Sequence, residues 1–230
     1  MTSVDNPSLL ALDTATEQCS VAVCHAGHEF SRCVATPRGH ADMILPMIQE
    51  VMSEAQVGFA DLHAIAFGRG PGAFTGVRIA IGVAQGLAYA SHLPLLPVSN
   101  LAVVAQQVAP ALLPGQTVLV CMDARMNEVY TGLYVVGQDG LVLLSDHEQV
   151  CSPEQVPDCQ PTRCLGTGFR AYPALAQRFC HVPVDGDVLP RAVQLLPLAV
   201  RDYVAGKQVA ADQAAPVYLR DRVTHVNKMQ

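Results

Sequence analysis

Residues 68–76, GRGPGAFTG, have the composition of a loop that could bind an anion. The glycine-rich stretch follows an apolar run and leads into a long helical pattern, and free N–H groups at a helix N-terminus attract negative charge. The helix that follows carries Gly82, Gly86 and Ala90 at four-residue spacing. That pattern lowers helix propensity and lets another backbone come close. The segment therefore fits either an anion site or a docking surface.

The known nucleotide-binding patterns do not fit this loop. Residues 68–73 satisfy the relaxed dinucleotide pattern G-x-G-x-x-A, but residues 87–99, where a ribose-binding acid belongs, contain no Asp or Glu. A P-loop is excluded because no Gly-Lys-Ser/Thr follows the glycines. These absences weaken the anion-site interpretation and favour docking.

Two aspartates at strand ends form a second candidate phosphate site. Asp13 ends an apolar strand and is followed by Thr14, and Asp123 ends a strand in the equivalent place of the second half. Two such hairpins facing each other across a cleft could clamp phosphate and Mg²⁺. The second turn continues with Arg125, where a close approach to phosphate favours glycine. A structural role for both carboxylates, capping turns at the lobe boundary, is the favoured alternative.

Other chemistry finds little support in the sequence. The histidines form neither H-E-x-x-H nor H-x-x-x-H, and no serine lies in G-x-S-x-G, so we expect neither a metal site nor hydrolysis. The net charge is −6 without a cluster of four Lys or Arg, which argues against direct RNA binding by this chain alone. The eight cysteines contain no C-x-x-C and suggest reduced thiols.

We also expect a cytoplasmic protein. The first residues, MTSVDNPS, do not have the pattern of a signal peptide, and no apolar run approaches the roughly 20 residues needed to span a bilayer. The sequence therefore predicts no membrane association.

The predicted elements form two α/β halves. Strands at 8–13, 19–25 and 28–36 precede a helix at 40–55, a strand at 63–67, a helix at 76–91, a strand at 94–98 and a helix at 99–109. This order indicates a mixed sheet flanked by helices. Strands at 117–123, 127–136 and 140–150, a helix around 171–180 and a helix at 190–205 follow. We predict a first lobe over 1–109 and a second over 110–230, whose tail could pack back on the first.

The helix at 40–55 has a methionine-rich face that has two interpretations. Met43, Met47, Ile48 and Val51 recur at helical spacing, which is most typical of core residues. Methionine is also common at adaptable protein surfaces. Together with the small residues of 76–91, this face could form a paired-helix surface that a partner completes. Core alone and core plus interface both stay open.

Several segments together resemble the TsaB (YeaZ) family. They are LLALDTATEQCSVAV (9–23), HADMILPMI (40–48), GRGPGAFTGVRIAIGVAQGLA (68–88), PVSNLA (97–102), DARMNEVY (123–130) and VYLRD (217–221). The resemblance runs essentially from end to end, and residues 70–79 are its most specific motif. Ala73 stands where the family usually has serine, which exchanges one small residue for another.

The resemblance implies a fold and a non-catalytic role. The fold is α/β, the two-lobed actin-like (ASKHA, ribonuclease H-like) architecture with mixed sheets flanked by helices. The family's paralogue TsaD catalyses threonylcarbamoylation of adenosine 37 in tRNAs that read codons beginning with A. Where TsaD has a metal-binding histidine pair, this sequence has Asn100 and Val104, so no metal is expected.

The implied partners are TsaD and TsaE, with a homodimer when TsaD is absent, and tRNA contact only through the complex. ATP and metal are expected on the partner subunits, with no cofactor on this chain alone. The predicted partner surface comprises Met43, Met47, Ile48, Val51, Gly82, Gly86 and Ala90. Asp13, Thr14 and Asp123 are predicted remnants of phosphate loops. The alternatives are a metal-dependent peptidase and an actin-like ATPase or kinase.

Overall fold

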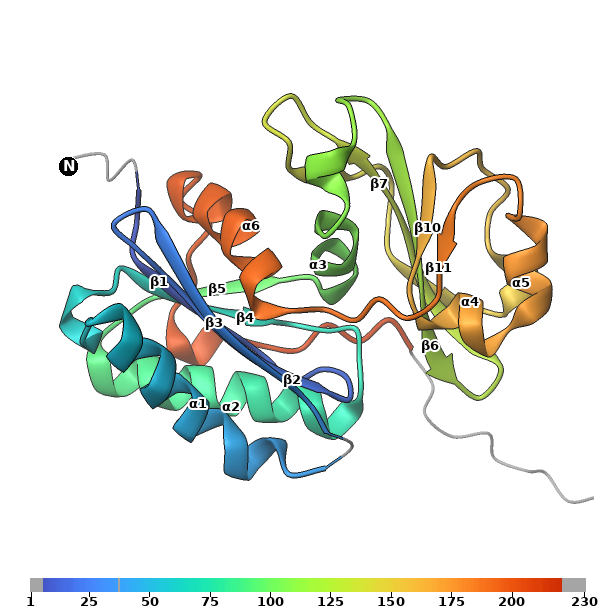
Figure 1. The fold of residues 1–230 in the computed structure, drawn as a ribbon. Coiled ribbons are helices and arrows are strands. Elements are labelled where there is room, and N and C mark those ends of the chain that lie inside the picture. The colour runs from blue at the N-terminus through green and yellow to red at the C-terminus, as the bar shows by residue number, and fades with distance from the viewer. Residues whose placement is uncertain (1–5, 37, 221–230) are drawn as a thin grey trace, which may run out of the picture.

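Two mixed sheets with helices around and between them form the molecule, as the computed structural model shows (Figure 1). The structure describes residues 6–36 and 38–220. Of the segments discussed above, the first five residues of MTSVDNPS and Asp221 of VYLRD lie outside this part. The predicted α/β architecture with two mixed sheets is confirmed.

The first sheet contains five strands in the order β3-β2-β1-β4-β5. Strands β1, β2 and β3 pair antiparallel, whereas β4 and β5 run parallel to β1. Strand β1 is buried along its whole length, in keeping with its nearly uninterrupted apolar sequence. The bounds are β1 Leu9–Asp13, β2 Gln18–His25, β3 His28–Ala35, β4 Ala64–Gly68 and β5 Leu95–Val98.

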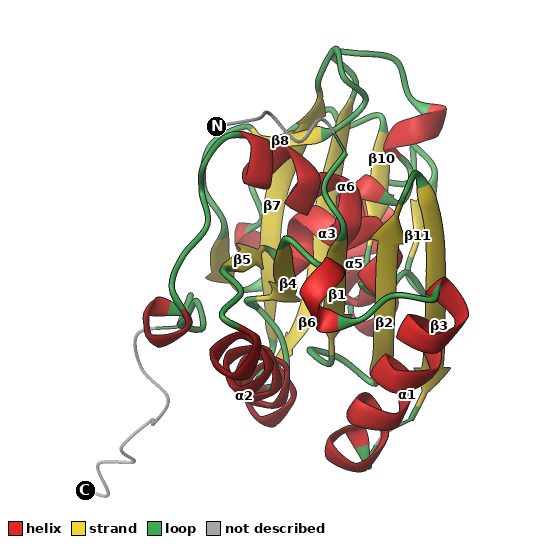
Figure 2. Ribbon diagram, turned by 90° about the vertical axis from the view of Figure 1, so that its left-hand side faces the viewer, coloured by secondary structure: helices red, strands yellow, loops and turns green. Residues whose placement is uncertain are grey.

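Helices α1 (His40–Ala55) and α2 (Phe74–Ser91) lie on one face of this sheet (Figures 1 and 2). Their inner faces join β1 and β4 in one apolar core cluster. Pro46 lies inside α1 without ending it, so the helix runs on to Ala55 as its apolar spacing predicts. The predicted order of strands and helices in residues 8–106 is therefore confirmed.

The second sheet has the order β11-β10-β6-β7-β8, and β9 also pairs with β7. The predicted helix around 171–180 is two short helices instead, since Pro173 lacks an N–H group and begins a new helix. The bounds are β6 Thr117–Arg125, β7 Glu128–Val136, β8 Val142–Leu144, β9 Gln149–Cys151, β10 Arg163–Leu165, β11 Val184–Asp185, α4 Thr167–Ala171 and α5 Pro173–Arg178.

Helices α3 (Asn100–Gln106) and α6 (Ala192–Val204) share an apolar core with both sheets. Helix α6 follows the second sheet in the chain but packs on β1, β2, β4 and β5 of the first. The division at 109/110 stays a prediction. Short 3₁₀ helices lie at Phe59–Asp61, Ala109–Ala111, Pro153–Gln155 and Ala211–Gln213.

The last described residues run from the first sheet to the second. Val209 bridges to Leu95 of β5, and Val217 N–H donates to the Arg69 carbonyl. Arg220 then reaches the β6–β7 turn, where it donates to the Ala124 carbonyl at 3.2 Å and pairs with Glu128. The tail therefore joins the two halves of the molecule.

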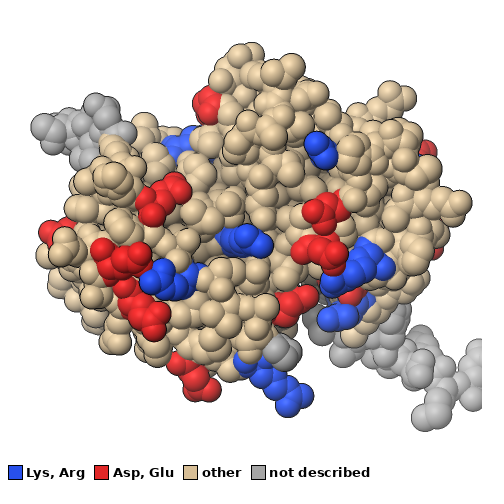
Figure 3. Space-filling view, in the orientation of Figure 1, with Lys and Arg blue, Asp and Glu red and all other residues tan. Residues whose placement is uncertain are grey.

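The surface charge is scattered on one face of the molecule. On the face shown in Figure 3, acidic and basic side chains of the described residues lie in small mixed groups without an extended basic patch. No helix among the described residues is long and apolar enough to cross a membrane.

Candidate functional site

The first predicted phosphate turn is closed by the protein itself. Asp13, at the end of β1, is completely buried. One carboxylate oxygen accepts from the Ala15 N–H at 3.1 Å, and the other accepts from the Asn100 side-chain amide. A Cβ on Gly68 would lie 1.8 Å from the second oxygen. The carboxylate therefore has no open side from which to approach a ligand.

The environment of Asp13 favours its neutral form. Desolvation by burial raises the pKa of this carboxyl group from 3.8 to about 7, against the opposing effect of the hydrogen bonds from Asn100 and Ala15. Asn100 is held in place because its side-chain oxygen accepts from the Gly70 N–H at 2.7 Å. Asp13 and Asn100 thus fix the loop after β4 to the end of β1.

The glycines after β4 allow the loop and helix α2 to pack on the first turn. Thr14 is buried and donates its hydroxyl to the Gly76 carbonyl at 2.7 Å. A Cβ on Gly76 would meet the Thr14 carbonyl oxygen at 2.0 Å, and one on Gly72 would meet the Ala15 carbonyl oxygen at 2.5 Å. These glycines serve backbone contact, and the space that a phosphate needs beside Thr14 is filled.

In the second predicted phosphate turn, neighbouring residues of the protein bind the carboxylate of Asp123. The Asp123 carboxylate pairs with the Arg125 guanidinium at 3.0 Å and accepts from the Arg125 N–H at 2.9 Å. It also accepts from the Tyr172 hydroxyl at 3.2 Å. Residues 125–127 all have positive φ angles between 54° and 61°, so the turn is left-handed throughout. Asp123 therefore shapes its own turn.

Asn100 and Val104, the two positions at which the resemblance led us to expect no metal-binding histidines, have no free metal ligand. Asn100 and Val104 are both completely buried in α3. Val104 has no ligand atom, and the Asn100 amide is already engaged by Asp13 and Gly70. In residues 6–36 and 38–220, no group of three or more His, Cys, Asp or Glu side chains could hold a metal ion.

Most of the predicted methionine-rich face lies in the core, which corrects the predicted surface. Met47, Ile48 and Val51 are buried against the first sheet and α2, so their side chains cannot contact a partner of the folded chain. Met43 is half-buried at the edge of the same cluster. The i, i+3, i+4 spacing therefore marks the inner face of α1, as such spacing usually does.

The small residues of α2 lie on its outer face. Gly82, Gly86 and Ala90 are exposed, and a Cβ on either glycine would meet no atom within 4 Å. Phe74 and Arg78 continue this four-residue series toward the helix N-terminus. We call these five residues the α2 stripe. Because i±4 rows form one ridge along a helix, the stripe is a continuous surface with a smooth centre.

Exposed apolar side chains that the sequence interpretation missed lie on the same two helices. Tyr89 is 81% exposed, Phe74 63% and Leu45 of α1 47%. The Arg78 guanidinium stacks on the Phe74 ring at 3.3 Å and donates to the Tyr218 hydroxyl of the tail. Extending the four-residue spacing back from Gly82 would have found Phe74 and Arg78, whereas no sequence signal placed Tyr218 there.

The comparison with protein families matches residues 34–163 to the family described as "TsaD: tRNA N6-adenosine threonylcarbamoyltransferase". The matched range begins near the end of β3 and ends at the start of β10, so it includes α1, α2 and α3.

Whole-chain relatives carry a more specific name. The chain is 42% identical to the Escherichia coli protein named tRNA threonylcarbamoyladenosine biosynthesis protein TsaB, over 94% of this chain and 95% of that protein. A Haemophilus influenzae protein of the same name is 39% identical over 96% and 97%. The solved structure described as YeaZ from Pseudomonas aeruginosa is 44% identical with a TM-score of 0.84, over 93% of this chain and all of that one.

The matches therefore cover nearly the whole chain, within the actin-like fold that the structure adopts. On these grounds the chain belongs to the TsaB (YeaZ) family.

Proposed function

We propose that this chain is a non-catalytic subunit in the formation of threonylcarbamoyladenosine on tRNA, and that it acts by binding TsaD. The observation that carries the proposal is the enclosure of Asp13 and Thr14 beside an exposed, smooth α2 stripe. An actin-like subunit with its first phosphate turn filled by its own backbone has lost the place where its chemistry would occur. The names of its relatives supply the pathway.

The proposed partner surface differs from the one that the sequence alone suggested. It retains Gly82, Gly86 and Ala90 and the half-buried Met43, and it adds the exposed Leu45 and Tyr89. Glycines at the centre allow a partner helix to approach closely, and flanking apolar side chains supply the area that is buried. In the absence of TsaD, a second copy of this chain would use the same surface to form a homodimer.

The remaining roles fall to the partners. We infer that this chain alone binds no cofactor, that ATP and metal are held by TsaD and TsaE, and that tRNA is contacted through the complex. A net charge of −6 supports the last point, because phosphate contacts depend on clustered Lys and Arg. From a role in tRNA modification we infer a cytoplasmic location. No observation favours a peptidase or a kinase.

Two measurements on the purified chain test this proposal. TsaD should co-purify with it at a fixed stoichiometry, and calorimetric titration of the isolated chain with Mg-ATP should give no heat of binding. Tight, Mg-dependent ATP binding that Asp13→Asn removes would instead favour an ATPase or kinase. Failure of TsaD to co-purify would remove the docking role.

A further inference from the structure

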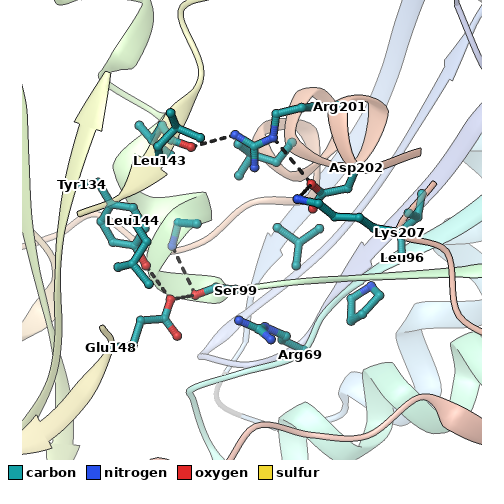
Figure 4. Close-up of a pocket in the computed structure, with 15 residues that line it drawn as sticks. Arg69, Leu96, Ser99, Tyr134, Leu143, Leu144, Glu148, Arg201, Asp202 and Lys207 are labelled. Atoms are coloured by element: carbon teal, nitrogen blue, oxygen red, sulfur yellow. Dashed lines mark hydrogen bonds and ion pairs between the residues drawn. The ribbon is translucent and has the colours of Figure 1, made fainter. Parts of the chain in front are cut away.

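A cavity of about 450 Å³ lies at the junction of the two sheets, and no residue of the α2 stripe lines it (Figure 4). Its size falls in the range of small-molecule sites. Arg69 directly follows β4 and Ser99 directly follows β5, so both stand at the carboxyl ends of parallel strands. Open α/β sheets commonly bind ligands at this edge. The second sheet supplies Tyr134 from β7 and Glu148 from the segment before β9.

One charged group in the cavity is a carboxylate held in a fixed position. Oε1 of Glu148 accepts from the Tyr134 hydroxyl at 2.5 Å and from the Ser99 hydroxyl. Burial and the neighbouring Glu148 raise the pKa of Tyr134 well above 10, which keeps its hydroxyl a donor. Among the described residues Oε2 of Glu148 has no hydrogen-bond donor. The carboxylate is thus oriented through Oε1, while Oε2 stays open to a donor from outside the protein.

The second charged group is the Arg69 guanidinium. The Arg69 N–H donates to the Val98 carbonyl at 2.8 Å and its carbonyl accepts from the Val217 N–H at 2.9 Å, so its backbone is fixed on both sides. Its Nε is buried and has no hydrogen-bond partner in the described part of the chain. A buried donor without an acceptor is costly, which makes this guanidinium a receptor for an acceptor group.

The two charges do not neutralise each other. Figure 4 shows Arg69 and Glu148 extending toward one another at the same end of the cavity, and no ion pair between them occurs in residues 6–36 and 38–220. By contrast, Arg201, Asp202 and Lys207 on the opposite rim form a paired group, with Lys207 2.9 Å from Asp202. Among the described lining residues, only the Arg69–Glu148 end therefore offers charges of both signs that no protein counter-charge pairs.

The remaining wall is apolar. Leu96 and Val98 come from β5, Leu198 from α6, and Leu143 and Leu144 from β8. Leu143 and Leu144 are exposed although they line the cavity, so a ligand could cover them. A ligand complementary to this cavity carries a negative and a positive group at one end and an apolar group at the other.

We propose that this cavity binds an apolar α-amino acid, with its carboxylate on Arg69, its ammonium group on Glu148 Oε2 and its side chain against the leucines of β8. A simple anion would leave Glu148 unsatisfied and repelled, and a simple amine would leave Arg69 without an acceptor. Both charges of the ligand are therefore needed. This site is independent of the docking role proposed for α2.

Calorimetric titration of the full-length protein tests the site with L-leucine and its two single-charge analogues, 3-methylbutylamine and 4-methylpentanoate. L-leucine should bind with 1:1 stoichiometry, and each analogue about tenfold more weakly or worse, because a hydrogen bond to a charged group contributes about that factor. Arg69→Gln and Glu148→Gln should each weaken leucine binding by a similar factor. Arg163→Gln, at an exposed position of β10, is the matched control and should leave binding unchanged.

Glu148 accepts a hydrogen bond from Tyr134, so the Glu148→Gln variant could lose stability. A measurement on the wild-type chain therefore tests the site without any substitution. Methyl NMR should show leucine-dependent shifts at Val98, Leu143 and Leu144. No saturable binding of leucine by the folded protein would overturn the proposal. So would equal binding of 4-methylpentanoate, which would indicate a plain anion site, or shifts confined to methyl groups outside the cavity.

Discussion

Replacing Gly86 by glutamate should separate partner binding from folding. Gly86 is exposed in the middle of α2, and a Cβ there would meet no atom within 4 Å. Glycine is less favourable than other residues inside a helix by about 0.5–1 kcal/mol. The isolated Gly86→Glu variant should therefore be as stable as the wild-type chain or slightly more stable.

The same substitution should disrupt a helix packed against the α2 stripe. A partner helix lying on glycine would meet the glutamate side chain and bury its carboxylate without a counter-charge. A disrupted contact at the centre of an interface typically costs about 2 kcal/mol or more, which corresponds to a roughly 30-fold rise in the dissociation constant. Surface plasmon resonance against TsaD measures that constant, and urea unfolding of the free variant measures its stability.

The matched control is Ala174→Glu, at an exposed position of helix α5 in the other half of the molecule. It adds the same charge to a helix and should leave TsaD affinity unchanged. If Gly86→Glu binds TsaD as tightly as Ala174→Glu, the α2 stripe is not the docking surface. If Gly86→Glu unfolds the free chain, position 86 has no room for a side chain and the reasoning from its open space fails.

Three further substitutions test the enclosed turn, the core and the tail. Burial raises the pKa of Asp13 from 3.8 to about 7, so the folded chain favours the neutral carboxyl group. The resulting contribution to the free energy of unfolding is present at low pH and is lost as pH rises from about 4 to 7. Over this range the free energy of unfolding, measured with urea, should fall by about 4 kcal/mol, and the Asp13→Asn variant should not show this pH-dependent fall. Met47→Ala should cost about 2–5 kcal/mol of unfolding free energy, because Met47 is buried. Arg220→Ala should speed proteolysis of residues 206–220, because Arg220 ties the tail to Glu128; an unchanged cleavage rate would refute this anchor.

The elements of this fold were largely predictable because their signals are local. The continuous apolar run of β1 and the 3.6-residue periodicity of α1 each follow from the residues of that element alone. The prediction of one helix around 171–180 was wrong even though the sequence contains the local signal that divides it, because Pro173 begins a new helix.

The site was less predictable because it depends on contacts between distant segments. Asn100 lies 87 residues from Asp13, and nothing in the sequence indicates that its amide encloses that carboxylate. An apolar stripe on α1 has the same i, i+3, i+4 spacing whether it faces the core or a partner. The sequence alone therefore could not show that Met47 is buried in the core. On α2, the four-residue spacing of small residues did identify an exposed face, since Gly82, Gly86 and Ala90 are all exposed.

The most direct test of a non-catalytic, TsaD-binding role is threonylcarbamoylation of tRNA in a reconstituted reaction from which this chain is omitted and then restored. Restoring wild-type protein should restore the modification. Asp13→Asn should restore it equally at a pH where the variant is folded, and Gly86→Glu should not. A folded Asp13→Asn variant that binds TsaD normally and yet supports no modification would show that this chain takes part in the chemistry.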